Sequence, residues 1–180
     1  CMDRTEVTET AYKACVEAGE CTKDKLTESY ATSTATTSTK SPYCNWDKPD
    51  RGNHPINCVD WTQAMAYCKS VKKRLPTEEE WEYGARGEEG RKYPWGSEAP
   101  AKQLCWNGEG NDLGKGKRRS TCAVGSYAAG VFGLNDMAGN VWEWTSSGYS
   151  EDYGKPRRDE RRVDRGGGWI INDPSGVRGA

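Results

Sequence analysis

The chain has 180 residues, a length typical of one ordinary domain, and 21 glycines and 8 tryptophans stand beside a single phenylalanine. Scarce aliphatic residues argue against long helices or a parallel sheet, and favour an irregular, loop-rich α+β fold with an aromatic core. The 26 basic and 27 acidic residues nearly cancel, which argues against a nucleic-acid partner, and no apolar run is long enough for a membrane span.

Near the N-terminus, the pattern predicts one helix followed by a polar loop. Thr8 can cap a helix that runs to Glu17, and Gly19 is placed to end it. The stretch from Thr27 to Ser41 is dominated by Thr and Ser and has almost no apolar side chain to bury. We therefore expect an exposed loop there.

Two further helices are predicted from capping boxes in the middle of the chain. Asp60 with Gln63, and Thr77 with Glu80, have the three-residue spacing of a capping box. The second helix is acidic in its first turn, which suits the helix dipole. The two expected helices span residues 61–72 and 78–85.

Residues 2–8 have a weak strand or lead-in character, and clearer strands are predicted in the last third of the chain. The alternation from Val141 to Trp144 is typical of a strand, and residues 162–169 read as another strand that ends in three glycines. Residues 107–121 and 146–162 are expected to be polar loops.

The 8 cysteines indicate disulfides rather than a metal site. Zinc sites favour two cysteines separated by two residues, and neither that spacing nor a second histidine beside His54 occurs. Cys15 and Cys21 flank the end of the first helix and could close a small loop. Disulfides favour an oxidising compartment, so we expect a secreted, periplasmic or cell-surface protein.

Four ordered segments carry a resemblance to a known family. They are residues 54–61 (HPINCVDW), residues 73–83 (KRLPTEEEWEY) with 93–96 (YPWG), residues 133–144 (GLNDMAGNVWEW) and residues 165–169 (RGGGW). In this order and spacing, over roughly residues 2–178, the chain resembles the formylglycine-generating-enzyme (sulfatase-modifying-factor) family. The resemblance implies a variant of the C-type-lectin fold, with two or three short helices and short antiparallel strands. We expect a single domain over residues 1–180 that is incomplete at its C-terminus.

The resemblance also implies a chemistry that this chain lacks the residues to perform. The family's enzyme oxidises a client cysteine to formylglycine with oxygen and copper, and two cysteines in one loop hold the copper. The matching positions here are Ile171 and Gly176, which cannot ligate Cu(I), and the family's preceding serine is Gly168. We therefore expect neither copper nor this catalysis.

A structural calcium ion is the second feature that the resemblance implies. Asp136 and Glu143 would supply carboxylates, and Gly139 and Val141 would supply carbonyl oxygens, the ligands that a hard cation prefers. The alternative is that Glu143 only caps a loop by accepting hydrogen bonds from backbone N–H groups. The family's other calcium position falls at residues 104–120, where its ligands are replaced and Cys105 and Cys122 bracket the loop.

Family resemblance guides the pairing of the remaining cysteines as well. Family members join the equivalent of Cys68 to a cysteine near the C-terminus, so Cys1 is left as its candidate partner here. The expected pairs are Cys15–Cys21, Cys44–Cys58, Cys105–Cys122 and Cys1–Cys68.

Three functions remain open at the level of sequence. The favoured one is a non-catalytic, disulfide-stabilised domain that binds a protein or a small molecule through the loop at residues 169–178. The alternatives are a formylglycine-generating oxidase and a structural subunit of a cell-surface or filament assembly, in which an open sheet edge accepts a partner strand. The residues expected to contact a ligand are Trp169, Ile170, Ile171, Asn172, Asp173, Ser175 and Arg178.

Overall fold

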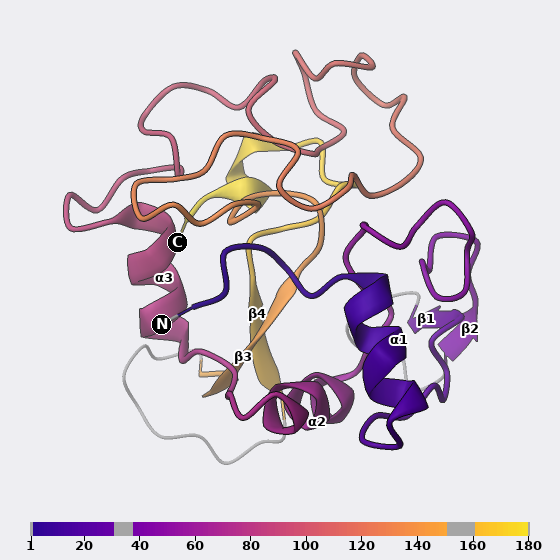
Figure 1. Cartoon of the computed structure of the whole chain (residues 1–180). Helices are drawn as coiled ribbons and strands as arrows, with labels where there is room; N and C mark the ends of the chain where they lie inside the picture. The colour runs from indigo at the N-terminus through magenta and orange to yellow at the C-terminus, as the bar shows by residue number, and fades with distance from the viewer. Residues whose placement is uncertain (1, 31–37, 151–160, 180) are drawn as a thin grey trace.

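The computed structural model describes residues 2–30, 38–150 and 161–179 and confirms a loop-rich α+β architecture. Its elements are α1 (Glu9–Glu17), β1 (Glu28–Tyr30), β2 (Ser38–Lys40), α2 (Trp61–Ser70), α3 (Glu78–Arg86), β3 (Glu143–Gly148), β4 (Arg162–Arg165) and the short 3-10 helix η1 (Pro174–Val177). Figure 1 shows α3 at one side of the molecule, α1 with the β1–β2 pair at the other, and the β3–β4 ribbon between them. Long loops cover the remaining end. Within the described ranges, every helix is too short or too polar to cross a bilayer.

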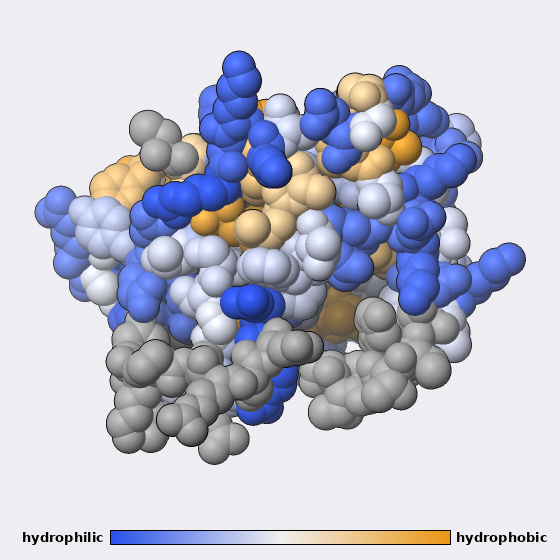
Figure 2. Space-filling model, turned by 90° about the horizontal axis from the view of Figure 1, so that it is seen from below, coloured by the Kyte–Doolittle hydropathy of each residue, from blue (hydrophilic) through white to orange (hydrophobic). Residues whose placement is uncertain are grey.

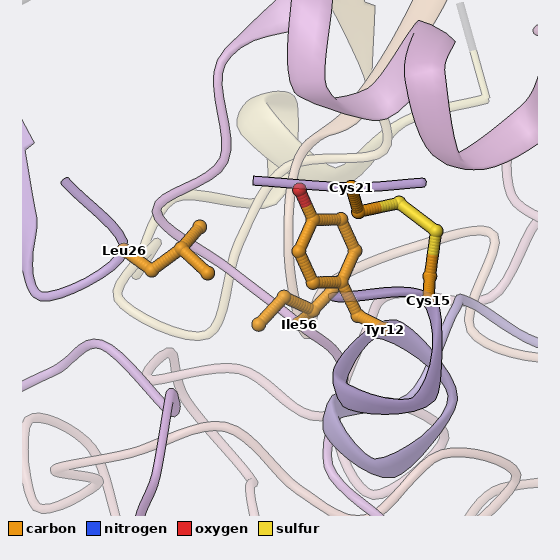
Figure 3. Close-up of a cluster of buried hydrophobic side chains, with 5 residues drawn as sticks. All are labelled: Tyr12, Cys15, Cys21, Leu26 and Ile56. Carbon is orange, nitrogen blue, oxygen red and sulfur yellow. A yellow bond between two sulfur atoms is a disulfide. The ribbon is translucent and has the colours of Figure 1, made fainter. Parts of the chain in front are cut away.

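The predicted first helix is confirmed together with its two boundaries. The Thr8 side chain accepts a hydrogen bond from the backbone N–H of Ala11, at 3.1 Å, and Gly19 adopts a positive φ of 75° just past the end. Tyr12, which is 1% exposed, packs at the centre of a small core. Figure 3 shows this core, formed by Tyr12, Cys15, Cys21, Leu26 and Ile56.

Both predicted capping boxes are present and define the starts of α2 and α3. The Asp60 side chain accepts from the backbone N–H of Gln63 at 2.8 Å, and Gln63 bonds back to the Asp60 N–H at 2.9 Å. A cap of this kind stabilises a helix by about 1 kcal/mol. Helix α3 buries Trp81 and Ala85 completely, as its sequence pattern predicts.

The prediction of a loop over residues 27–41 is wrong at both ends. Strands β1 and β2 pair antiparallel, with Glu28 opposite Lys40 and Ser29 opposite Thr39. Opposite charges and paired hydroxyl residues stabilise such a ladder without any apolar face, which is why composition alone predicted a loop. Residues 31–37 lie outside the described residues.

Strands β3 and β4 form an antiparallel ribbon that packs against α3. Glu143 pairs with Arg165, and Gly148 pairs with Arg162. Arg165 also bridges to Glu78 and Glu82 of α3, at 3.0 Å each. The strand predicted from Val141 therefore begins two residues later. The loop predicted over 146–162 is shorter, since β3 continues to Gly148, and residues 151–160 lie outside the described residues.

The glycine run after β4 permits the close packing that its sequence predicts. Gly167 has a φ of 76°, and a Cβ atom there would lie 2.2 Å from the carbonyl oxygen of Gly176. A Cβ on Gly166 would lie 3.2 Å from the Trp81 ring. The chain thus passes between α3 and η1 at distances that only glycine allows.

Three of the four expected disulfides are confirmed: Cys15–Cys21, Cys44–Cys58 and Cys105–Cys122. The fourth involves Cys1, which lies outside the described residues. Among the described cysteines, Cys68 is the free one, and burial raises the pKa of its thiol.

Candidate functional site

The recognition loop, which we define as residues 169–178, is anchored to the core by backbone hydrogen bonds. The Trp169 N–H donates to the Asn140 carbonyl at 2.7 Å, and the Ile171 carbonyl accepts from the Asn107 N–H at 2.9 Å. Asp173 caps η1 by accepting from the Ser175 N–H at 2.7 Å. The loop therefore has a defined shape set by the segments on either side of it.

Ile171 and Gly176 lie side by side within the recognition loop. A Cβ atom on Gly176 would be 2.9 Å from Cγ2 of Ile171. The Ile171 side chain is half-buried and packs on the core cluster that contains Tyr93, Trp106 and Val177. An aliphatic side chain thus fills the space between the two positions, where no sulfur is present.

The outward surface of the loop is apolar at one end and polar at the other. Ile170 is 59% exposed, whereas Trp169, which we expected to contact a ligand, is only 8% exposed. The exposed polar side chains are Asn172, Asp173, Ser175 and Arg178.

Two aromatic residues that sequence reasoning missed extend this surface. Tyr43, 45% exposed, lies against Trp169 with ring centroids 5.3 Å apart. Trp142, 46% exposed, lies beside Gly168, where a Cβ atom would be 3.4 Å from its Cδ1. For Trp142 the available signal was its place in the motif at residues 133–144, directly before the start of β3. For Tyr43 the sequence holds no such signal, because the Cys44–Cys58 disulfide brings in a distant segment.

A cavity of about 510 Å³ lies elsewhere, among loops that precede the recognition loop. Its lining residues are Trp95, Ala101, Lys102, Gln103, Gly110, Ala128 and Ala129. No residue of the recognition loop lines it. The loop therefore offers an exposed surface and does not border this cavity.

The predicted metal residues lie at a buried acidic centre, which we define as Glu6, Asp136 and Glu143. The Glu143 carboxylate accepts a hydrogen bond from the Trp81 indole N–H at 2.8 Å. Burial, together with the charge of Asp136, raises the pKa of Glu143 to about 7. Burial also raises the pKa of Asp136, which accepts from the Gly125 N–H at 2.6 Å.

Glu6 is a member of the acidic centre that sequence reasoning missed. One of its oxygens accepts from the Asn140 side chain at 2.8 Å, while its buried Oε1 has no hydrogen-bond partner among the described residues. Burial and the charges of Glu143 and Asp136 raise its pKa well above the ordinary value. Glu6 is 134 residues from Asn140, so no local pattern could have predicted the contact.

Gly139 and Val141 lie in the segment between Asp136 and Glu143, and the Val141 backbone N–H is a hydrogen-bond partner of Glu6. Gly139 has a φ of 80°, and a Cβ atom there would lie 2.4 Å from the Cys105 carbonyl oxygen. In the described parts of the chain, no three His, Cys, Asp or Glu side chains converge closely enough to hold a metal ion by themselves. Any ion here would need the backbone carbonyls as well.

The loop bracketed by Cys105 and Cys122 is organised by a buried guanidinium. Arg118, 6% exposed, donates to the Trp106 carbonyl at 3.0 Å and to the Cys122 sulfur at 2.8 Å. It also pairs with Asp112 and donates to the Tyr127 hydroxyl at 3.3 Å. One side chain thus joins four parts of this loop and its flank.

Comparison with known proteins places the whole chain in one family. The model of the sulfatase-modifying factor enzyme 1-like domain matches residues 1–180. The chain is 39% identical over 122 residues to a formylglycine-generating enzyme of Thermomonospora curvata, an alignment that covers 64% of this chain and 40% of the relative. It is 40% identical over 124 residues to the mouse "inactive C-alpha-formylglycine-generating enzyme 2", covering 64% of this chain and 38% of the relative.

A solved structure gives the same result for the fold. PvdO from Pseudomonas aeruginosa superposes with a TM-score of 0.69 at 26% identity, covering 97% of this chain and 71% of that structure. The chain spans less than half the length of the two curated relatives above. On the match of its full length, the chain belongs to the sulfatase-modifying factor enzyme 1-like family, the family of the formylglycine-generating enzymes.

Proposed function

We propose that this chain is a non-catalytic protein-binding domain that works outside the cytoplasm and binds its partner through the recognition loop. The observation that carries the proposal is the contact of Ile171 with the Gly176 position. If these two positions held the family's copper cysteines, two thiolates would meet at this place. Here an aliphatic side chain occupies it, and a hydrocarbon offers Cu(I) no ligand.

A protein partner fits this surface better than a small molecule does. Ile170, Tyr43 and Trp142 are large apolar side chains that are about half exposed, next to exposed polar residues of the same loop. Aromatic anchors within a polar rim are typical of protein-binding hot spots. Small ligands favour concave sites, and the cavity described above is not lined by this loop.

Two further observations support the proposal. One similar protein carries the name of an active enzyme and another that of an inactive one. Similarity to this family is therefore compatible with the absence of catalysis. The three disulfides are typical of proteins from oxidising compartments and support a location outside the cytoplasm.

We also propose a structural calcium ion at the acidic centre. Glu143, Asp136 and the carbonyls of Gly139 and Val141 would hold it, and the Glu6 carboxylate would lie next to them. The unpaired Oε1 of Glu6 supports this, because a buried carboxylate oxygen without a donor is costly unless a cation or a proton compensates it. The donor to Glu143 is an indole rather than a backbone N–H, so loop capping does not account for this side chain. The ion would join the N-terminal segment to the turn before β3.

Copper titration coupled to oxygen-consumption measurements tests the absence of catalysis. We expect neither stoichiometric Cu(I) binding nor oxygen uptake with a cysteine-containing peptide. Stoichiometric Cu(I) binding with turnover of that peptide would show that the chain is an enzyme and would end the proposal.

Selection from a random peptide library on the immobilised protein tests the binding surface. We expect selected peptides to lose affinity by about tenfold or more for Ile170→Ser, in line with the truncation of a hot-spot anchor. Val71→Ser, which truncates an aliphatic side chain that is 41% exposed just past the end of α2, is the matched control. Peptides that bind both variants equally well would place recognition elsewhere.

A further inference from the structure

A second exposed apolar surface lies on the opposite side of α3 from its buried tryptophan. Tyr83, Val131 and Phe132 are 52%, 46% and 46% exposed, and the rings of Tyr83 and Phe132 have centroids 5.1 Å apart. Val131 lies over Gly87, where a Cβ atom would be 2.8 Å from its Cγ1. Figure 2, seen from below, shows hydrophobic side chains among hydrophilic ones on the α3 side, at the left. We call these three residues the α3 face. Such a contiguous patch marks an interaction site more often than single exposed residues do.

Acidic side chains surround the α3 face. Glu79 lies one helical turn before Tyr83, and Glu88 accepts from the Tyr83 hydroxyl at 3.3 Å. Both are exposed, and neither forms an ion pair within the described parts of the chain. By contrast, Glu80 in the same helix is held by Arg74, which lowers the pKa of Glu80 to about 2. The α3 face therefore presents an apolar centre with uncompensated negative charge around it.

A surface of opposite character lies at the tip of another loop. Leu113 is 51% exposed, and Lys115 and Lys117 follow it on the same exposed loop. Lys115 has only a 4.0 Å contact with Glu109, and Lys117 forms no ion pair among the described residues. In Figure 1 this loop lies at the upper right, whereas α3 lies at the left. We call these three residues the Leu113 tip.

We propose that the Leu113 tip of one copy of this chain docks on the α3 face of a second copy. The leucine would pack on the Tyr83–Phe132 pair, and the lysines would meet Glu79 and Glu88. Because the two surfaces are different and lie on different sides of the molecule, the contact is heterologous and repeats from copy to copy. It goes beyond the proposed binding function and uses none of the residues assigned to the recognition loop.

Sedimentation velocity over a range of protein concentrations tests the proposal. We expect assembly beyond the dimer as concentration rises, and weaker assembly at high salt, because a Debye length of about 3 Å at 1 M salt screens the lysine–glutamate contacts. Two variants each remove one surface: Tyr83→Ser with Phe132→Ser, and Leu113→Ser with Lys117→Glu. Each variant alone should be monomeric, and an equimolar mixture should form a dimer and nothing larger, since one intact pair of surfaces remains.

The controls separate this contact from other interactions. Val71→Ser should assemble like the unmodified chain. A third variant, Glu79→Lys with Glu88→Lys, keeps the aromatic pair and should weaken association by about tenfold or more if the charges contribute as in other steered interfaces. A monomeric protein at every concentration overturns the proposal, as does either surface variant that assembles normally, or a mixture of folded variants that stays monomeric.

Discussion

Two adjoining regions of this domain carry buried charge in different ways. In the loop between Cys105 and Cys122, the charge is the guanidinium of Arg118, which has an acidic partner in Asp112 and hydrogen bonds to Trp106 and Tyr127. In the acidic centre, Glu6 and Glu143 are buried without a cation within the described parts of the chain. The first region supplies its own counter-ion, whereas in the second the raised pKa values of Glu6 and Glu143 favour the protonated carboxyls.

Hydrogen bonds join the two regions, so a change in one region is transmitted to the other. The Asn140 side chain accepts from the Cys122 N–H at 2.9 Å, and the Asn140 N–H donates to the Cys105 carbonyl at 2.8 Å. A change in the protonation or ion binding of the acidic centre should therefore also change the order of the Arg118 loop. The comparison teaches that one loop can balance a buried charge with its own side chains while its neighbour leaves a buried carboxylate oxygen without a hydrogen-bond partner among the described residues.

Removing the internal cation should have the largest effect. Arg118→Met keeps a flexible apolar stem but leaves the Trp106 carbonyl and Asp112 without their donor. We expect a loss of about 3 to 6 kcal/mol in the free energy of unfolding, since two hydrogen bonds from a charged group, to Trp106 and Tyr127, are lost at about 1.5 to 3 kcal/mol each. Urea unfolding followed by tryptophan fluorescence measures it. Arg119→Met, one residue away on an exposed side chain, should change stability by less than about 0.5 kcal/mol. Equal effects of the two substitutions would show that Arg118 does not organise the loop.

Opening the disulfide of the same loop should have the next largest effect. Cys105 and Cys122 are separated by 17 residues, and a loop of about this length gives about 3 kcal/mol by the chain-entropy model. We expect the Cys105→Ala, Cys122→Ala protein to unfold at correspondingly lower denaturant concentration. The Cys15–Cys21 disulfide closes a loop of only 6 residues, so Cys15→Ala, Cys21→Ala should destabilise the protein less. A larger loss of stability in the Cys15→Ala, Cys21→Ala protein than in the Cys105→Ala, Cys122→Ala protein would contradict the view that the 105–122 loop is a main element of stability.

The acidic centre should make stability depend on pH in the opposite sense to an ordinary salt bridge. Because the pKa of Glu143 is raised from 4.5 to about 7, the folded protein holds a proton that the unfolded chain releases between these pH values. In calcium-free buffer, the free energy of unfolding should therefore fall as pH rises from about 4.5 to 7, by up to about 3 kcal/mol. The pKa of Glu80 is lowered, so its ion pair stabilises the folded state above pH 4.5 and loses this effect only as the pH falls toward 2.

Glu143→Gln provides the control for this pH dependence. The amide can still accept from the Trp81 indole, and the substitution removes one of the carboxyls with a raised pKa, so the slope between pH 4.5 and 7 should become shallower. Thermal unfolding in calcium-free buffers across this range measures the slope in both proteins. A free energy of unfolding that stays constant or rises with pH in the unmodified protein would contradict the assignment of Glu143.

Calcium should give the smallest effect and should weaken the dependence on pH. At ten times its Kd, an ion that binds only the folded state adds about 1.4 kcal/mol. We expect this gain near neutral pH, a smaller one near pH 5 where protons compete, and none in Glu143→Gln. Isothermal titration calorimetry and thermal unfolding with and without calcium measure it. Stabilisation by calcium that is unchanged in Glu143→Gln would place the ion elsewhere.

Local sequence patterns predicted the parts of the fold that local interactions determine. Thr8, Asp60 and Thr77 cap their helices because a cap needs only the next three residues. Strands β1 and β2 were missed because their stability comes from cross-strand pairs, which composition does not reveal.

The candidate site shows the same division between local and distant contacts. Ile171 and Gly176 could be identified because they lie within one recognisable loop. Glu6 and Tyr43 could not, since each reaches its site from a segment more than 100 residues away. Trp169 was expected on the surface, but its contact with Tyr43 covers it.

The contact between Ile171 and the Gly176 position also restricts the order in which mutations can be accepted. A cysteine placed first at position 176 would put its Cβ atom 2.9 Å from Cγ2 of Ile171, which overpacks the loop. A cysteine placed first at position 171 shortens the side chain and opens room for the second. A pair of thiols at positions 171 and 176 could therefore be introduced without overpacking through only one of the two single mutants. The route to both cysteines is thus narrower than a count of two substitutions implies.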